Sequence, residues 1–319
     1  IENTYDSLNR ETIKKVEHDN SETYTITRNT SYQYGDATNQ TTALVNIVQY
    51  TYGNESVTTR PSYQIRYVYD DLGNIAEEYH RTSPETGSTA YTEKPHGKYW
   101  YDEQNQLLMD RTYGPDGSGT NTYYLYDTVG NIVERRSNSS TFTSPGQMYE
   151  YTELEAEQIE THTYGYNDTT WRDLLTSYDG QSITYDAIGN PLSYYNGQRY
   201  TMTWSNGRQL DSTNVGGMNL SYSYNADGQR TSKSRSAYYT DEYVYYGTQL
   251  STLIRSGVGY KHSLTFIYDD AGQALGFYYD TNLNDSNPGT KYYYVCNAQG
   301  DVLQLRDHTN APVANYYYD

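Results

Sequence analysis

The stretch YVYDDLGNIAEEYH, residues 67–80, contains a short frame that decides the fold of the chain. In this frame a Tyr-Asp pair is followed, two residues later, by a Gly-Asn pair. The frame returns as YDTVGN at Tyr126, YDAIGN at Tyr185 and YDDAGQ at Tyr268, and in looser form as YDSLNR at Tyr5, YDEQNQ at Tyr101 and YNADGQ at Tyr224. A segment that recurs in this way indicates a repeat architecture.

The frame has the residues of a bulged hairpin turn. Asp70 stands at the first position of a type I turn and Gly73 at the fourth, where a residue in the left-handed region completes a three-residue hairpin loop. Glycine takes that conformation without steric cost. Asn tolerates it next best, and it replaces Gly in two copies, as Asn9 and Asn105. The leading Asp is expected to accept a hydrogen bond from the backbone N–H two residues on.

The sequences on either side of the turns are typical of strands. LSYSY precedes Asn225 and LTFIY precedes Asp269, and both are rich in β-prone residues. From Tyr185 onward, turns recur about every 20 to 28 residues, so that each hairpin buries its face against its neighbours. We therefore predict an all-β fold of consecutive β-hairpins. Residues 1–184 are expected to be less regular, with long loop insertions, and residues 185–319 more regular.

We assign structural turn roles to the residues of the four most complete copies. These residues are Tyr69, Asp70, Gly73, Asn74, Tyr126, Asp127, Gly130, Asn131, Tyr185, Asp186, Gly189, Asn190, Tyr268, Asp269 and Gly272. Segments rich in Gly, Pro, Ser, Thr, Asn or Asp are predicted as surface loops at 80–98, 137–147 and 280–290. Residues 149–166 fit either a short helix or a polar strand pair.

The composition is dominated by tyrosine. The 319 residues include 43 Tyr but 3 Phe and 3 Trp, so tyrosine must supply most of the buried surface, and its hydroxyl needs a polar partner. The formal net charge is −18, and the sequence holds no basic stripe of the kind that binds phosphate. No apolar run approaches the length of a membrane span. We therefore expect no nucleic-acid partner and no membrane insertion.

The repeated frame resembles the Rhs/YD-repeat family, which includes bacterial Rhs and wall-associated proteins, shell subunits of insecticidal toxin complexes and animal teneurins. The four complete copies carry the resemblance. WRDLLTSYDGQSITYDAIGNPLSY (171–194) and YYYVCNAQGDVLQLRDHTNAPVANYYYD (292–319) resemble the Gram-positive branch. The resemblance implies a β-sheet that spirals into a hollow shell, of which this chain is one part, up to the end of the core. It also implies a secreted or cell-surface location.

The function implied by the resemblance is structural. The chain would be a non-enzymatic segment of a shell that encapsulates or displays a C-terminal toxin or effector. Its partners would be other parts of the same shell, further copies of itself or the toxin cargo. The sequence shows no toxin domain and no self-cleavage junction, so neither cargo nor processing is assigned to any residue. Two alternatives stay open: a self-assembling extracellular filament or sheath subunit, and an adhesin segment that binds glycans or a partner protein.

No catalytic or cofactor-binding constellation is evident in the sequence. The six histidines are scattered along it, and none forms a His-Glu-x-x-His motif or a Cys/His cluster. Paired acids such as Asp70-Asp71 lie in turns, where the first carboxylate has a structural role. The single cysteine, Cys296, excludes an internal disulfide, and it fits a small buried side chain or a reactive thiol.

One stretch offers oxygen ligands for a metal ion. In DTNLNDSN, residues 280–287, Asp280, Asn282, Asn284 and Asp285 resemble the start of a calcium-binding loop. The Gly and the bidentate Glu that complete such a loop are absent. Calcium is therefore the one cofactor considered, and a plain polar loop is the alternative.

Overall fold

The structure is a computed structural model, and it describes residues 1–18, 24–34, 41–53, 60–82, 92–114, 116–139, 160–281, 283, 289–316 and 318. All regular secondary structure in these ranges is β, which confirms the predicted fold class. The described ranges contain no helix with the length and apolar character needed to cross a membrane.

The strands form two sheets of thirteen, each in chain order, and every described pairing is antiparallel. The first sheet contains β1 (Glu2–Tyr5), β2 (Glu11–His18), β3 (Tyr24–Tyr34), β4 (Thr41–Gly53), β5 (Arg60–Tyr69), β6 (Ile75–Thr82), β7 (Glu93–Tyr101), β8 (Leu107–Tyr113), β9 (Gly119–Tyr126), β10 (Ile132–Asn138), β11 (Glu160–Gly165), β12 (Ser177–Tyr178) and β13 (Gln181–Ser182). The second contains β14 (Thr184–Tyr185), β15 (Pro191–Asn196), β16 (Gln198–Ser205), β17 (Gln209–Val215), β18 (Met218–Tyr224), β19 (Arg230–Arg235), β20 (Tyr239–Tyr246), β21 (Gln249–Gly257), β22 (Tyr260–Tyr268), β23 (Ala274–Asp280), β24 (Thr290–Cys296), β25 (Val302–Asp307) and β26 (Pro312–Asn315).

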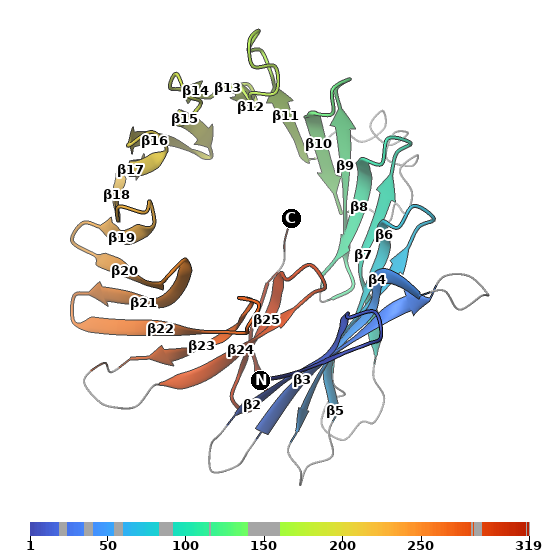
Figure 1. Ribbon diagram of the computed structural model, residues 1–319. Helices are drawn as coiled ribbons and strands as arrows, with labels where there is room; N and C mark the ends of the chain where they lie inside the picture. Colours follow the sequence, from blue (N-terminus) through green and yellow to red (C-terminus); the bar gives the residue numbers. More distant parts are fainter. Residues whose placement is uncertain are drawn as a thin grey trace. The chain divides into compact units, whose positions relative to one another are not determined.

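The chain divides into two compact units. Unit 1 comprises Ile1–Thr161, Val295–Leu303 and Tyr316–Asp319, and unit 2 comprises His162–Tyr294 and Gln304–Asn315. Figure 1 shows that consecutive strands lie side by side within each unit, for example β5 to β10 in unit 1 and β19 to β23 in unit 2. Neighbours in sequence are thus neighbours in space, as expected of a hairpin repeat.

One core cluster of unit 1 combines tyrosine with aliphatic side chains. Three of its seven buried side chains are tyrosines, and the full set is Val48, Tyr50, Tyr63, Ile65, Tyr67, Val295 and Leu303. The last two come from the segment Val295–Leu303, which is distant in sequence from β4 and β5. Buried tyrosine hydroxyls need polar partners, and two of these hydroxyls find them in the backbone of that segment.

Two tyrosines of unit 1 bind the backbone of the segment Val295–Leu303. The Tyr50 hydroxyl donates to the Cys296 carbonyl (3.1 Å) and accepts from the Cys296 N–H (2.9 Å). The Tyr67 hydroxyl accepts from the Ala298 N–H (3.0 Å). Cys296 is buried, and burial raises the pKa of its thiol to about 11. These contacts favour the reading of Cys296 as a buried side chain over that of a reactive thiol.

The loop predicted at 80–98 has wrong bounds, because both of its ends lie in strands. β6 continues to Thr82 and β7 begins at Glu93. Glu93 accepts two hydrogen bonds from Arg66 (3.0 and 2.9 Å) and pairs with Arg81 (3.5 Å), so ion pairs across three strands extend the sheet into this polar sequence. Ion pairing between strands is a tertiary contact that local composition does not reveal.

The other predicted loops also begin or end inside strands. β10 includes the first two residues of the 137–147 segment and ends at Asn138, whose side chain is buried. Asp280 ends β23 and Thr290 begins β24, so the 280–290 segment starts and stops in sheet. In the 149–166 segment, residues 160–165 form β11, and residues 149–159 lie outside the described ranges.

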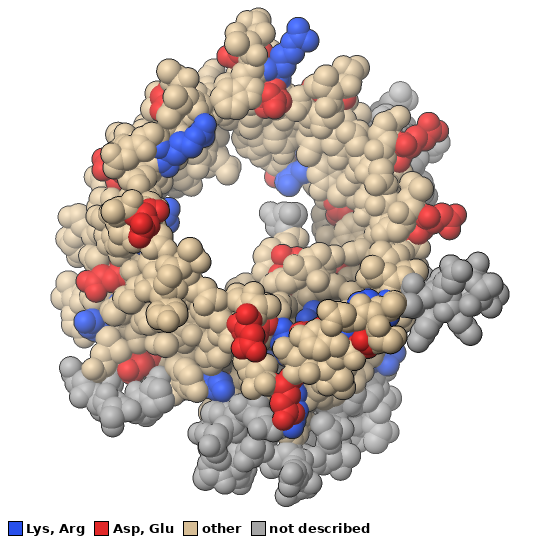
Figure 2. All heavy atoms as spheres, in the orientation of Figure 1, with Lys and Arg blue, Asp and Glu red and all other residues tan. Residues whose placement is uncertain are grey.

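Basic side chains occur beside acidic ones in both units. In unit 1, Lys98 Nζ lies 2.7 Å from Glu77 Oε1. In unit 2, Arg255 donates to both carboxylate oxygens of the buried Asp241 (2.6 and 2.9 Å). On the face drawn in Figure 2, the Lys and Arg side chains of the described residues form no continuous stripe.

Candidate functional site

The Asp-x-x-Gly turns share one backbone geometry. In the turn after β5, the Asp70 N–H donates to the Asn74 carbonyl (2.9 Å), and the Gly73 N–H donates to the Asp70 carbonyl (3.1 Å). The strand register shifts between Val68 and Tyr69, as in a bulged hairpin. Gly73 has a φ of 88°. The residues at the same position in other copies also have positive φ: Asn9, Asn105, Gly130, Gly189, Gly228 and Gly272.

The carboxylate of Asp70 fixes its own turn. Oδ1 accepts from the backbone N–H groups of Leu72 (2.9 Å) and Asn74 (2.8 Å), and Oδ2 accepts from Asn74 Nδ2 (3.0 Å). Asp127 and Asp186 accept the corresponding three bonds. Burial acts to raise the pKa of Asp70, but the bonds from Asn74 and Leu72 outweigh it, and the pKa is lowered.

The side chains of the first and fifth residues of the turn form a hydrogen bond in several copies. Where Asp leads, as at Asp6, the fifth residue donates, as Arg10 Nε does (2.7 Å). Where Asn225 leads, its Nδ2 instead donates to Gln229 Oε1 (2.8 Å), and Asn297 Nδ2 donates to Asp301 Oδ2 in the same way (2.8 Å). Sequence reasoning gave the fifth residue no contact. The signal was present in part of the copies: Asp is followed by Asn at Asn74, Asn131 and Asn190 and by Arg at Arg10, but by Gln at Gln106 and Gln273.

In many copies the tyrosine before the turn links neighbouring hairpins. At the end of β7, the Tyr101 hydroxyl donates to the carbonyl of Ile75 (3.0 Å), the first residue of β6 after the previous turn. The described β6–β7 register stops at Glu77 and Lys98, so this bond lies beyond the end of the backbone ladder. The same kind of bond joins Tyr69 to Val45, Tyr126 to Leu107, Tyr185 to Leu175, Tyr224 to Leu210, Tyr245 to Arg230, Tyr268 to Leu250 and Tyr318 to Val302. We call these contacts inter-hairpin bonds.

Trp204 occupies the tyrosine position of a degenerate copy and makes the equivalent contact. Its indole N–H donates to the carbonyl of Pro191 (2.7 Å), the first residue after the preceding turn. In this copy the indole N–H therefore takes the place of the tyrosine hydroxyl. Aromatic side chains thus make directed bonds to the backbone, besides ring contacts such as that between Tyr194 and Tyr200 (centroids 4.6 Å apart).

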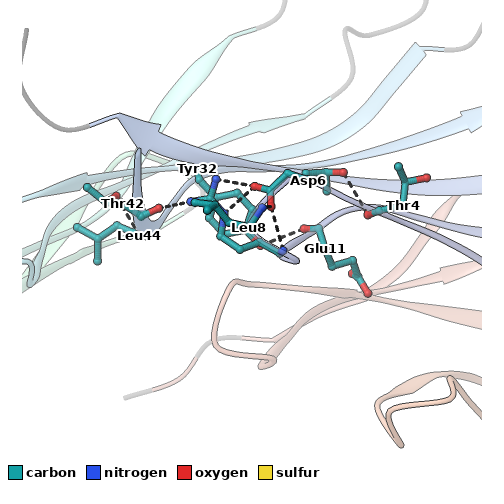
Figure 3. A network of polar contacts seen from close by, with 9 residues as sticks. Thr4, Asp6, Leu8, Glu11, Tyr32, Thr42 and Leu44 are labelled. Carbon is teal, nitrogen blue, oxygen red and sulfur yellow. Dashed lines mark hydrogen bonds and ion pairs between the residues drawn. The ribbon is translucent and has the colours of Figure 1, made fainter. Parts of the chain in front are cut away.

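The first copy of the frame shows these elements together (Figure 3). Asp6 accepts hydrogen bonds within its turn, and the Tyr32 hydroxyl donates to the Glu11 carbonyl (3.0 Å). The Arg10 guanidinium lies 4.1 Å from the centroid of the Tyr32 ring and also donates to the Thr42 carbonyl. One turn is thereby connected to two further strands, β3 and β4.

Replacing Asp70 with alanine is expected to lower the free energy of unfolding by about 1–2 kcal/mol. Two backbone N–H groups and the Asn74 amide would lose their acceptor. The neighbouring Asp71 is exposed in the same turn and provides the matched control, with an expected change within about 0.5 kcal/mol for Asp71→Ala. Urea denaturation of both variants measures the difference, and equal midpoints would contradict the role given to Asp70.

A second group of polar side chains lies in unit 1, where the sequence indicated only scattered histidines. Glu78 and His80 on β6 and His96 on β7 bring one carboxylate oxygen and two imidazole nitrogens within 4.8 Å of one another. His80 Nε2 lies 2.5 Å from Glu78 Oε1, and the rings of His80 and His96 stack with centroids 3.7 Å apart. Two histidines that are scattered in the sequence therefore come together in the fold. His80 and His96 are 16 positions apart in the sequence, and this separation hid the pairing of β6 with β7.

A β-bulge accounts for the position of His96. Glu78 pairs with Gly97 and Tyr79 pairs with Pro95, which leaves His96 as the extra residue on β7. Bulges re-aim side chains, and proline within a sheet is tolerated at such irregular positions. At Gly97 a Cβ atom would collide with the ring of Tyr99, so glycine provides the space in which that ring lies.

The three residues are largely buried. Glu78 is 6% exposed, and the side chain of His80 is 12% exposed. The Tyr63 hydroxyl lies 2.8 Å from His80 Nδ1, so both nitrogens of that ring have partners. Burial, and then the neighbouring His80, lower the pKa of His96 to about 4, so His96 is neutral at physiological pH. Two imidazoles and a carboxylate are a donor set suited to a transition-metal ion.

A cavity of about 630 Å³ adjoins this cluster on unit 1. His96, Tyr99 and Asp110 are among its lining residues, with others from β8, β9 and β10. Asp110 is 7% exposed and accepts a hydrogen bond from the Tyr124 hydroxyl (2.9 Å). Burial raises the pKa of Asp110 to about 6, despite the opposing effect of that bond. The cavity thus combines tyrosine hydroxyls with an acid that titrates near neutrality.

Asp110→Asn is expected to stabilise the protein at pH 8 by about 2 kcal/mol and to have little effect below pH 4. The folded state raises the pKa of Asp110 above its unfolded value of 3.8, so the protein loses stability as the pH rises through about 6 and this carboxyl ionises. An amide removes that ionisation and keeps an acceptor for Tyr124. Denaturation curves at pH 4 and pH 8 test this, and the same difference at both values would contradict it.

Of the four predicted calcium ligands, the structure describes one, Asp280. Asp280 is the last residue of β23, where it pairs with Ser263 of β22. Asn282, Asn284 and Asp285 lie outside the described residues. Calcium binding there stays a prediction.

Comparison with known proteins gives relatives and a shared fold. No family model matches the chain. The tRNA3(Ser)-specific nuclease WapA of Bacillus spizizenii is 30% identical over 148 residues, and the tRNA nuclease WapA of Bacillus subtilis is 29% identical over the same length. Each match covers 46% of this chain and 6% of the relative, so the chain corresponds to a small part of those proteins.

Solved structures of TcdB2-TccC3 match almost the whole chain. One superimposes with a TM-score of 0.59 at 14% identity, covering 99% of this chain and 16% of that one. A structure of TcdB2-TccC3 without its hypervariable C-terminal region gives a TM-score of 0.57, covering 99% and 15%. At this level of identity the likeness shows the fold. The repeated Tyr-Asp frame, the likeness to WapA and this shared fold together support the resemblance of the chain to the Rhs/YD-repeat family.

Proposed function

We propose that the chain is a non-enzymatic wall segment of an extracellular shell that encloses or displays a C-terminal toxin or effector. The observation that carries the proposal is the series of inter-hairpin bonds. They join successive hairpins at the turn edge, beyond the end of the backbone ladder in the β6–β7 and β8–β9 pairs. A wall built from many hairpins needs such links, because each hairpin alone buries little surface.

The likeness to the WapA proteins supports this proposal, but their nuclease activity is not assigned to this chain. The WapA proteins are nucleases by name, and the matched region is a small share of their length. The turn carboxylates, including Asp70, are occupied by hydrogen bonds within their own turns. In this proposal, any catalytic activity belongs to the cargo, and the described hairpins contribute enclosure.

Protease protection tests the proposal. In the full-length protein that contains this chain, the region C-terminal to the repeats is expected to be cleaved at least about tenfold more slowly than the same region produced alone, since a closed wall excludes the protease. Tyr101→Phe combined with Tyr126→Phe removes two inter-hairpin bonds and should reduce the protection. Tyr246→Phe, at a side chain that is 85% exposed, is the control. Equal cleavage of the attached and isolated regions would reject enclosure.

A further inference from the structure

The cluster of Glu78, His80 and His96 has properties that the shell function does not use. The carboxylate of Glu78 is buried, and among the described residues its ion-pair partner is His80. Burying a carboxylate is costly unless a cation compensates it. A protonated imidazole supplies such compensation in part, and a metal ion would supply it fully.

We propose that Glu78, His80 and His96 bind a divalent transition-metal ion of the zinc class. Two imidazole nitrogens and one carboxylate oxygen form a common set of three protein ligands for zinc, with a further position left for water or another ligand. The donor atoms already lie within 4.8 Å of one another. Ligands about 2.0–2.2 Å from one ion are separated by roughly 3–3.5 Å, so modest side-chain rotations would complete the site.

His80 is prepared for this role by its second nitrogen. The ion would lie between His80 Nε2 and Glu78 Oε1, atoms that are now 2.5 Å apart and would move apart to admit it. His80 Nδ1 would then carry its proton toward the Tyr63 hydroxyl, 2.8 Å away. A metal-bound histidine commonly donates its other N–H to an oxygen in this way, which fixes the orientation of the ring.

His96 would provide the third bond and the opening to solvent. Its ring now lies parallel to that of His80, with an interplanar angle of 12°, and must turn out of this stack to direct a nitrogen at the same ion. His96 also lines the 630 Å³ cavity, through which an ion and its remaining water ligand would enter. The site would therefore bind an exchangeable ion rather than an enclosed structural one.

A tyrosine–histidine pair alone does not define such a site, and unit 2 provides the comparison. His262 Nδ1 lies 2.8 Å from the Tyr279 hydroxyl, as His80 Nδ1 does from Tyr63. Among the described residues, only the group around His80 has three metal-ligating atoms close together. His262 is therefore a matched control, since it has the same pairing without the additional ligands.

Zinc binding by the purified protein tests the proposal. After treatment with a chelator and its removal, equilibrium dialysis against Zn²⁺ should give one tightly bound equivalent per chain. His96→Ala and Glu78→Gln should each weaken binding at least about tenfold, whereas His262→Ala should leave it unchanged. Co²⁺ in place of Zn²⁺ should give visible absorption bands that the His96→Ala protein lacks.

Two results would overturn the proposal. One is the absence of a tightly bound equivalent in the unmodified protein, and the other is an equal loss of binding in His96→Ala and His262→Ala. Circular dichroism shows whether each variant is folded. If His96→Ala is not, His96→Gln keeps a polar side chain of similar length, and binding equal to that of the unmodified protein would equally reject the site.

Discussion

Gly276→Ala is expected to lower the free energy of unfolding of unit 2 by about 3 kcal/mol or more. Gly276 lies in β23, between Ile267 of β22 and Tyr293 of β24. A Cβ atom at this position would overlap the carbonyl oxygen of Tyr292. That oxygen belongs to the backbone and cannot rotate away, so β23 and β24 would have to separate. Urea denaturation followed by tyrosine fluorescence measures the loss.

Gly217→Ala separates this overlap from the general cost of replacing glycine. Gly217 has a φ of 81°, and a Cβ atom there would meet no other heavy atom within 4 Å. Its replacement should cost only the strain of the left-handed conformation, about 1 kcal/mol. If Gly276→Ala costs no more than Gly217→Ala, close approach of β24 does not explain the glycine at position 276.

The second large effect is expected when the hydroxyls of Tyr50 and Tyr67 are removed together. Tyr50→Phe leaves the Cys296 N–H without its acceptor, and Tyr67→Phe does the same to the Ala298 N–H. A buried donor without a partner costs about 1–3 kcal/mol, so the double variant should lose about 3–4 kcal/mol. Hydrogen exchange at the amides of Cys296 and Ala298 should accelerate by at least about a hundredfold.

Faster exchange should be confined to the segment Val295–Leu303, which distinguishes the loss of these hydrogen bonds from destabilisation of the whole protein. Amides of β16 to β19 in unit 2 should keep their exchange rates, because none of the three lost hydrogen bonds involves them. Tyr246→Phe, at a tyrosine that is largely exposed, should leave the exchange rates of the Cys296 and Ala298 amides unchanged. Unaltered exchange at these amides in the double variant would show that the tyrosine rings, rather than the hydroxyls, hold the segment Val295–Leu303.

The hairpin fold could be predicted because its determinants are local. Asp70 and Gly73 act within one five-residue turn, and the strands on either side have β-prone sequences. The same locality explains why Asn9 and Asn105 replace Gly, since both adopt the left-handed conformation with φ of 60° and 65°. Features that depend on a few adjacent residues are visible in the sequence.

The histidine cluster could not be predicted because it depends on register and on a bulge. His80 and His96 are separated by a segment whose composition suggested a loop, and only the pairing of β6 with β7 brings them together. A shift of one residue in that pairing would place His96 on the opposite face. Periodicity predicts that strands exist, but it does not predict where a bulge inserts an extra residue.

The inter-hairpin bonds have a consequence for how such chains change over generations. Each one runs from a side chain to a backbone carbonyl, as between Tyr126 and Leu107 or between Trp204 and Pro191. Every residue carries that carbonyl, so the receiving position places no demand on the amino acid that occupies it. A whole hairpin can then be duplicated, deleted or exchanged by recombination, and its neighbours will bind the newcomer without compensating mutations. Length becomes a heritable variable that selection can adjust in steps of one hairpin.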